Sequence, residues 1–213
     1  MTGRSNKATA YALLLVLLLL ALTPARAHHQ SASNGPIRGV AIPAITHGEM
    51  PVVADYRSRI LALAARQGVT DPTLRRLAGF ISLQTFACFW GLVPGSLSDE
   101  ASPFNECTHA YLAGVKAQLA HMTAMPGDQS AAKELEARMD AEIANDPTAS
   151  VICSNSSQAF DSADVIGPDW QLAATHLPTV LTFAVTVVLV VAGLATAARR
   201  RLFRDPATST VAS

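Results

Sequence analysis

The chain has 213 residues, half of them hydrophobic, and its 16 acidic and 16 basic side chains give a formal net charge of zero. The charges are segregated, because residues 28–176 hold 15 acidic and 9 basic side chains while the other bases flank two long apolar runs. A nucleic-acid-binding protein would carry its bases as a patch on the folded domain, so the pattern indicates a membrane protein and excludes nucleic acid as a partner.

The first apolar run predicts a signal peptide over residues 1–27. Arg4 and Lys7 precede twelve apolar residues, Tyr11 to Leu22, and Ala25-Arg26-Ala27 supplies small residues for cleavage. Twelve helical residues span about 18 Å, which is too short for a hydrocarbon core of roughly 30 Å. We therefore expect this segment to be removed, with an uncleaved anchor as the alternative.

Residues 28–50 are rich in Ser, Gly and Pro and lack apolar periodicity, which predicts a flexible arm. Cleavage would leave His28 as the new N-terminus, followed by His29. An N-terminal histidine can bind copper through its amine and its ring. A rigid site needs an ordered surrounding, however, so a chance histidine pair is the favoured interpretation here.

Residues 51–147 predict a small all-α domain of four helices joined by short breaks, which favours antiparallel neighbours. The expected helices cover residues 51–68, 72–91, 103–124 and 128–145. The second helix has the clearest start, with Asp71 as its cap and Pro72 at its first position. It carries apolar residues on two sides, so we expect it to be the central helix.

The chain ends with a juxtamembrane segment, a span and a tail. Residues 148–176 read as a polar, irregular connection, and residues 177–198 predict a transmembrane helix whose core, residues 178–198, is about 31 Å long. Arg199, Arg200 and Arg201 follow at once, so the positive-inside rule predicts a cytoplasmic tail over residues 199–213. The helical domain would then lie on the periplasmic side of the cytoplasmic (inner) membrane.

The three cysteines fall on the predicted oxidising side of the membrane. Cys88 ends the second helix and Cys107 begins the third, so antiparallel packing would bring them together as a disulfide that closes a loop of about 20 residues. Pairing of either cysteine with Cys153 remains the alternative. The odd count leaves Cys153 as an unpaired thiol or an intermolecular bridge.

Two histidine groups are candidates for metal ligands, and copper is the metal that imidazole and sulfur together suit. His121 and Met125 are four residues apart on the third helix, and Cys107-Thr108-His109 places another imidazole near its start. The candidate metal set is therefore His109, His121 and Met125. Thr46-His47-Gly48-Glu49-Met50 offers a further His, carboxylate and thioether, but the motif alone adds little weight.

The end of the second helix carries three aromatic residues, Phe86, Phe89 and Trp90, which cannot all face one core. Either Phe86 and Trp90 are core residues and Phe89 packs under the following loop, or the three form a docking surface for a partner. No nucleophile elbow, phosphate loop or zinc motif occurs in the chain.

These features favour a non-enzymatic, single-pass envelope protein that acts as an accessory or interaction subunit for another membrane or envelope protein. The alternative is a membrane-anchored, extracytoplasmic copper-binding protein.

Overall fold

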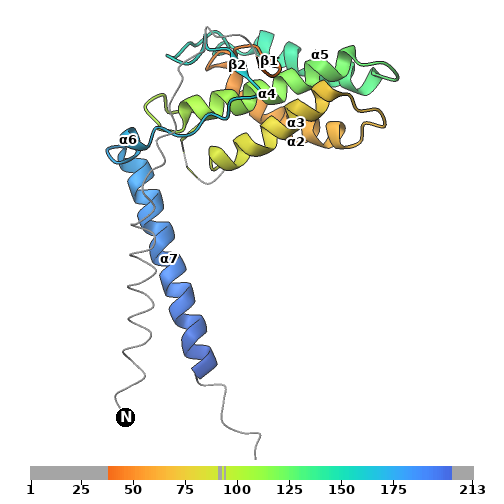
Figure 1. The fold of residues 1–213 in the computed structure, drawn as a ribbon. Helices are drawn as coiled ribbons and strands as arrows, with labels where there is room; N and C mark the ends of the chain where they lie inside the picture. The colour runs from red at the N-terminus through yellow and green to blue at the C-terminus, as the bar shows by residue number, and fades with distance from the viewer. Residues whose placement is uncertain (1–37, 91–92, 94, 203–213) are drawn as a thin grey trace, which may run out of the picture. The chain divides into compact units, whose positions relative to one another are not determined.

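The computed structural model describes residues 38–90, 93 and 95–202, so the predicted signal peptide, His28 and His29, and most of the tail lie outside it. Within these residues the chain is mostly helical, which confirms the all-α prediction (Figure 1). The elements are β1 (Ala41–Ile42), α2 (Glu49–Ala65), α3 (Pro72–Ala87), α4 (Asn105–Ala124), α5 (Ser130–Asn145), β2 (Phe160–Asp161), α6 (Trp170–Ala173) and α7 (Leu177–Leu202).

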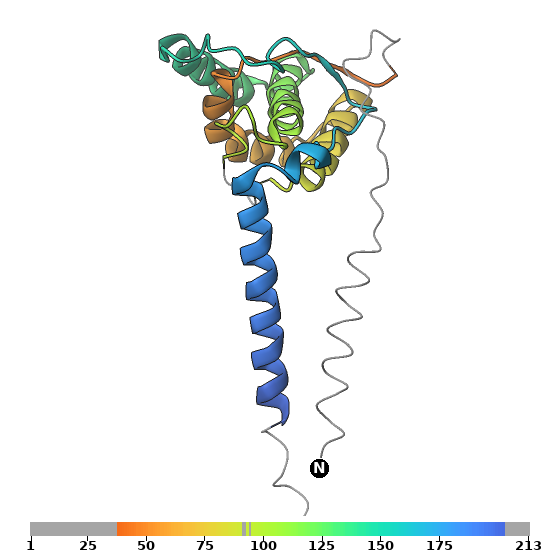
Figure 2. The ribbon, with the colours of Figure 1, turned by 90° about the vertical axis from the view of Figure 1, so that its left-hand side faces the viewer.

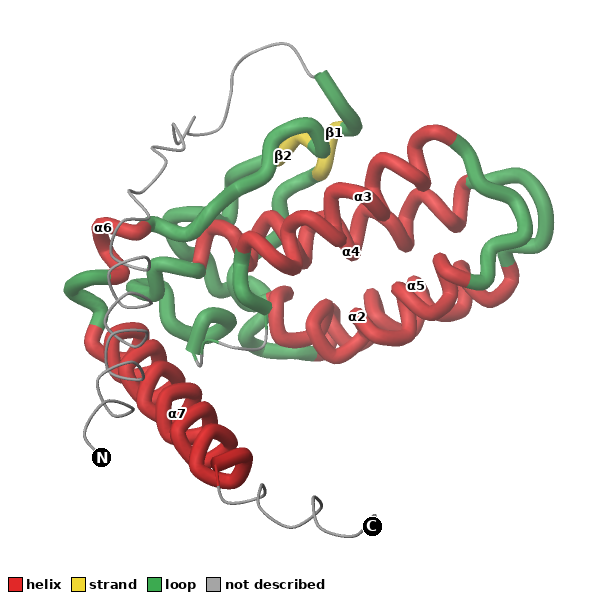
Figure 3. Tube along the Cα trace, turned by 60° about the horizontal axis from the view of Figure 1, so that its bottom comes forward, coloured by secondary structure: helices red, strands yellow, loops and turns green. Residues whose placement is uncertain are grey.

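The four helices α2 to α5 form the domain, and consecutive helices run in alternate directions (Figures 1 and 3). The central helix is α4, which packs against α2, α3 and α5 and lies between α2 and α3 in Figure 2. The prediction that α3 is central was wrong, because only one side of α3 is covered. The small residues of α4 allow close packing: a Cβ atom added at Gly114 would lie 2.9 Å from the Phe80 ring of α3.

Both ends of α3 are defined by local chemistry. The Asp71 carboxylate accepts a 2.7 Å hydrogen bond from the Leu74 backbone N–H, as predicted for an N-cap. At the other end the Phe89 and Trp90 N–H groups donate to the carbonyls of Phe86 and Thr85, and Phe89 adopts a positive φ of 49°. This is the Schellman arrangement, with phenylalanine in the position that glycine usually occupies.

The segments before and after the helices are more ordered than the sequence suggested. Strands β1 and β2 pair in antiparallel fashion, with Ala41 opposite Asp161 and Ile42 opposite Phe160. The described part of the predicted flexible arm is therefore paired with the predicted irregular juxtamembrane segment. The two strands are separated by more than 100 residues, so no local pattern reveals their pairing.

The juxtamembrane segment is also attached to α3 by one buried side chain. The Gln84 amide donates a 2.6 Å hydrogen bond to the Ile166 carbonyl and accepts a 3.0 Å bond from the Ile166 N–H. Gln84 is fully buried, so its amide gives the backbone of Ile166 the two partners that a neighbouring strand would give.

Helix α7 begins at Leu177, as predicted, and continues to Leu202, beyond the predicted end at 198. Its segment Leu177–Arg200 is long and apolar enough to cross a membrane, and its 18-residue apolar window has no residue buried inside the protein. The chain thus carries, within its described residues, one helix suited to membrane anchoring.

Candidate metal centre

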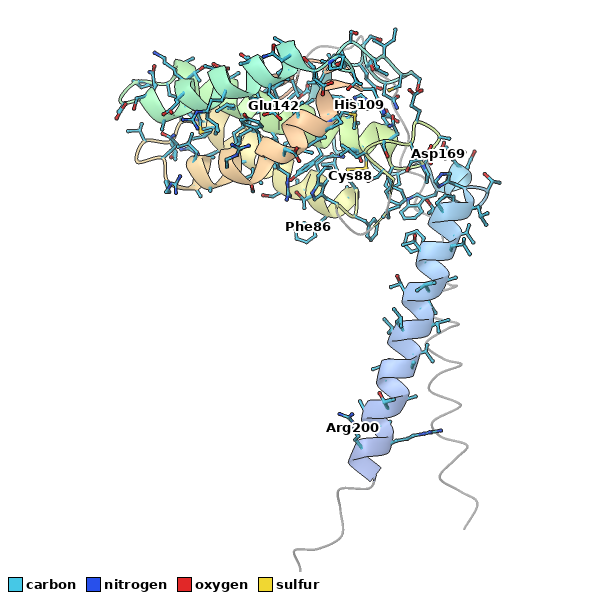
Figure 4. The ribbon with its side chains drawn as sticks, turned by 180° about the vertical axis from the view of Figure 1, so that it is seen from behind. Phe86, Cys88, His109, Glu142, Asp169 and Arg200 are labelled. Carbon is cyan, nitrogen blue, oxygen red and sulfur yellow. A yellow bond between two sulfur atoms is a disulfide. The ribbon has the colours of Figure 1, made fainter. Side chains whose placement is uncertain are left out.

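Three segments that are distant in sequence bring His47, His109 and Cys153 together. One potential metal-binding atom from each residue lies within 4.8 Å of the other two. The Nε2 atom of His109 is 3.1 Å from the Cys153 sulfur, and the imidazole rings of His47 and His109 are 5.7 Å apart between centroids. Figure 4 shows His109 within the helical domain, on α4.

His47 is held by the start of α2. The Thr46 hydroxyl accepts a 3.1 Å hydrogen bond from the Glu49 N–H, and the Glu49 carboxylate accepts a 3.0 Å bond from the Thr46 N–H. This reciprocal pair is a capping box. The second oxygen of Glu49 pairs with Lys116 of α4 at 3.0 Å, so the turn that carries His47 is fixed to the central helix.

Gly48 lets the loop that leads to Cys153 approach this turn. Its N–H donates a 3.0 Å hydrogen bond to the Val151 carbonyl. A Cβ atom at position 48 would lie 1.7 Å from the Thr148 carbonyl oxygen, so only glycine fits between the two segments. The Thr46 hydroxyl also donates to the Ala149 carbonyl at 2.5 Å, which gives the two loops a second link.

Ser156 joins the backbones of two of the three residues. Its hydroxyl oxygen accepts hydrogen bonds from the His47 N–H at 3.0 Å and from the Cys153 N–H at 2.8 Å. The same hydroxyl lies 3.5 Å from the Cys153 sulfur and can donate its proton there. Ser156, which is 9% exposed, therefore adds a third link that fixes Cys153 relative to His47.

His109 is the most buried of the three, at 1% exposure. The pKa of His109 is lowered to about 4, chiefly by burial and secondly by the neighbouring His47, while a hydrogen bond to the Ile45 backbone acts in the opposite direction. The ring is therefore neutral at physiological pH. The Nε2 atom of His109 faces the Cys153 sulfur, and metal-binding histidines likewise present one ring nitrogen to the metal while the other is hydrogen-bonded.

Several buried polar atoms around the cluster have no hydrogen-bond partner in the described residues. They are Nδ1 of His47, Nδ2 of Asn105 and Oγ1 of Thr108. The Asn105 carbonyl oxygen lies 3.7 Å from the Cys153 sulfur, so its amide borders the cluster. An unpaired buried polar group costs about 1–3 kcal/mol, and a bound ion would relieve that cost for a ring nitrogen of His47.

The geometry fits a metal ion better than a catalytic thiol. Ligand atoms bound to one metal by N and S lie roughly 3.3–3.8 Å apart, so the cluster needs a contraction of about 1 Å at its widest separation. A cysteine nucleophile would need the ion pair of thiolate and protonated imidazole. Both the burial of His109 and the neighbouring His47 oppose that protonation.

The metal ligands predicted from sequence do not come together. His109 and His121 are twelve residues apart on α4, which separates them by about 18 Å along the helix. The Nε2 atom of His121 lies 2.8 Å from the Asp71 carboxylate, and Met125 is buried beyond the helix end, with extended backbone. The set of His109, His121 and Met125 was therefore wrong, with only His109 in the observed cluster.

The three aromatic residues at the end of α3 differ in their exposure and in their contacts. Phe86 is 80% exposed and points away from α3 (Figure 4). The Phe89 ring makes edge contacts with Phe104, Trp170 and Phe183, at centroid distances of 6.1–6.3 Å. Trp90 packs on Tyr111 at 4.7 Å beneath the Arg57 guanidinium. Of the predicted docking residues, Phe86 alone is largely exposed.

The cysteines lie as the helical hairpin predicts. Cys88 and Cys107 are at disulfide-bonding distance, with their Cα atoms 5.5 Å apart. Cys153 has no disulfide partner and is partly exposed. Its contact with His109 was not predicted. The capping-box pattern Thr46-x-x-Glu49 was a signal that His47 belongs to an ordered helix start rather than to a flexible arm.

No family model matches the chain, and no curated protein or solved structure matches it either.

Proposed function

We propose that the chain is a membrane-anchored, extracytoplasmic protein that binds a transition metal ion through His47, His109 and Cys153. The observation that carries this proposal is the convergence of two imidazoles and one thiol, from three separate segments, within 4.8 Å of one another. Imidazole and thiolate are ligands for zinc, copper and iron, whereas magnesium and calcium prefer oxygen. The protein acts as a binding protein rather than as an enzyme.

The surroundings of the cluster support this function. The capping box, Gly48 and Ser156 fix the backbones of His47 and Cys153 before any metal arrives. Cys153 is partly exposed, which gives an ion a route from solvent, while His109 is buried. A preset site with one accessible ligand is suited to binding an ion and releasing it.

The proposed location follows from α7 and the bases after it. Under the positive-inside rule, Arg199, Arg200 and Arg201 favour a cytoplasmic tail, which would leave the cluster in the periplasm. A reporter that is active only outside the cytoplasm should give a signal when fused after Asp169 and none when fused after Ser213. The reverse result would contradict the orientation.

Metal analysis of the native protein tests the function. The full chain, purified in detergent without chelators, should contain close to one transition metal ion per molecule. Cys153→Ser and His109→Ala should lose it, whereas His121→Ala, a histidine outside the cluster, should keep it. Replacing His28 and His29 by alanine controls for binding at the N-terminus. A metal content that these cluster variants do not change would contradict the proposal.

A second role, as an accessory subunit for another envelope protein, is supported by the outer face of α3. Leu83 and Phe86 are three residues apart on this helix and are 58% and 80% exposed. Neighbouring side chains at this spacing form a continuous apolar surface. Phe86→Asp should release a co-purifying membrane protein while metal content is unchanged. Co-purification unaffected by this substitution would exclude the surface as a docking site.

A further inference from the structure

We infer that the ion bound by His47, His109 and Cys153 is monovalent copper, held by these three ligands alone. This inference rests on the proposed function and adds the identity and oxidation state of the metal. Three features of the cluster carry it: its charge, its number of ligands and the softness of its sulfur.

The charge of the cluster matches a monovalent ion. Cys153 supplies one negative charge as a thiolate, and two neutral imidazoles supply none. No carboxylate of the described residues joins the group. Monovalent copper would give a neutral centre, whereas a divalent ion would leave one positive charge beside His109, which is 1% exposed. An uncompensated buried charge is costly, so burial favours the monovalent ion.

The carboxylates closest in sequence to His47 and His109 are already engaged elsewhere. Glu49 pairs with Lys116 and accepts from the Thr46 N–H, and Glu106 accepts a 2.8 Å hydrogen bond from Gln158. Glu49 and Glu106 would have to break these contacts to bind a divalent ion and neutralise its second positive charge.

The number of ligands also favours monovalent copper. Zinc is almost always bound by four ligands, and a site with three protein ligands leaves its fourth position to water or substrate. Among the described histidine, cysteine and acidic residues, three ligand atoms make up this group. Thiolate is a soft ligand that suits monovalent copper as well as zinc, and imidazole is compatible with both metals. Two nitrogens and one sulfur complete a three-coordinate copper centre without a further ligand.

Binding has a defined proton balance. The thiol of Cys153 loses its proton as the bond between sulfur and copper forms, so one proton leaves for solvent and no electron is transferred. The Ser156 hydroxyl, 3.5 Å from the sulfur, can donate a hydrogen bond to the thiolate that results.

The test is a titration of the full chain in detergent with monovalent copper, under anaerobic conditions, with a non-thiol reductant that leaves the Cys88–Cys107 pair intact. Competition with chromophoric chelators for copper and for zinc measures the affinity of the chain for each metal. We expect one equivalent of copper per chain and no displacement by excess zinc. Cys153→Ser should abolish the tight binding, while His121→Ala and the double variant of His28 and His29 should retain it.

The results of this titration distinguish the identity of the metal from the metal-binding function itself. Tight zinc binding at the same three residues, with copper displaced by zinc, would overturn the identity of the metal and leave a metal-binding function intact. Copper bound equally by Cys153→Ser and by the unaltered chain would overturn both. Because Cys153 is partly exposed and serine is close in size, this variant keeps the fold available for the measurement.

Discussion

His109 connects the chemistry of the site with the stability of the metal-free protein. Its pKa in the folded protein is lowered to about 4, chiefly by burial, from an ordinary value of 6.5. Below pH 6.5 the unfolded chain therefore takes up a proton that the folded chain does not. Protonation then favours the unfolded state, so the contribution of His109 to stability is complete above pH 6.5 and declines toward pH 4.

We therefore predict that acid destabilises the metal-free protein through this one residue. Because of His109, the free energy of unfolding should fall by an amount on the order of 3 kcal/mol between pH 6.5 and 4. The His109→Gln variant should lack this decrease. Thermal unfolding followed by circular dichroism over this range measures the difference between the two proteins. Parallel curves for the two proteins would show that His109 is not held neutral in the fold.

Phe89 occupies a backbone conformation that favours glycine, with φ at 49°. The left-handed conformation costs about 1–2 kcal/mol in a residue that has a Cβ atom. The contacts of its ring with Phe104, Trp170 and Phe183 offset that cost. The sequence offered no sign of this, because Gly91, the residue that suggested a helix end, comes two positions later.

The backbone strain at Phe89 and the contacts of its ring can be measured separately by substitution. Phe89→Ala should destabilise the domain by about 2–3 kcal/mol, since it loses the ring and keeps the strained backbone. Phe89→Gly should destabilise it by about 1 kcal/mol less, because glycine removes the strain. Chemical denaturation of both variants gives the comparison. If the glycine variant were the less stable, the positive φ would not be a source of strain.

Among the elements, α3 depends on contacts at its C-terminal end that hydrophobic periodicity does not show. Gln84 is fully buried and binds both backbone groups of Ile166. Gln84→Met would keep a similar volume but leave the N–H and C=O of Ile166 without partners. We predict a loss of about 1–3 kcal/mol and faster hydrogen exchange in residues 160–169.

Hydrogen exchange with mass spectrometry resolves this segment from the helices. Ser82→Ala is a matched control on α3, because the Ser82 hydroxyl bonds within its own helix. Unchanged protection of residues 160–169 in Gln84→Met would mean that other contacts hold the segment in place.

The connection between α3 and α4 depends on Cys88 and Cys107. A disulfide here would restrict the loop between the two helices in the unfolded chain, and its removal should cost about 2–5 kcal/mol. Cys88→Ser and Cys107→Ser should therefore unfold at lower denaturant concentration than Cys153→Ser, compared without metal. Peptide mapping without reduction checks the pairing, and recovery of both residues as alkylatable thiols would contradict it.

For the whole molecule, the sequence predicts the structural features that depend on residues close to one another along the chain. The start of α3 follows from Asp71 and Pro72, the start of α7 from a long apolar run, and the proximity of Cys88 and Cys107 from a helical hairpin. Each of these features involves residues of one helix, or of two consecutive helices.

The site could not be predicted in the same way because its parts are far apart in sequence. His47 and Cys153 are separated by more than 100 residues, and each lies in a segment that reads as an irregular loop. Their meeting depends on the pairing of β1 with β2, on the contact between Gly48 and residue 148, and on the hydroxyl of Ser156. None of these contacts has a periodic signature.

The central claim is that His47, His109 and Cys153 hold one metal ion, and X-ray absorption at the copper edge tests it most directly. Native full-length protein, purified in detergent, should show a monovalent edge with two imidazole nitrogens and one sulfur bound to copper. Cys153→Ser should remove the sulfur contribution, and His121→Ala should leave the spectrum unchanged. A first shell of nitrogen and oxygen alone, identical in the unaltered chain and in Cys153→Ser, would place the copper elsewhere and contradict the account.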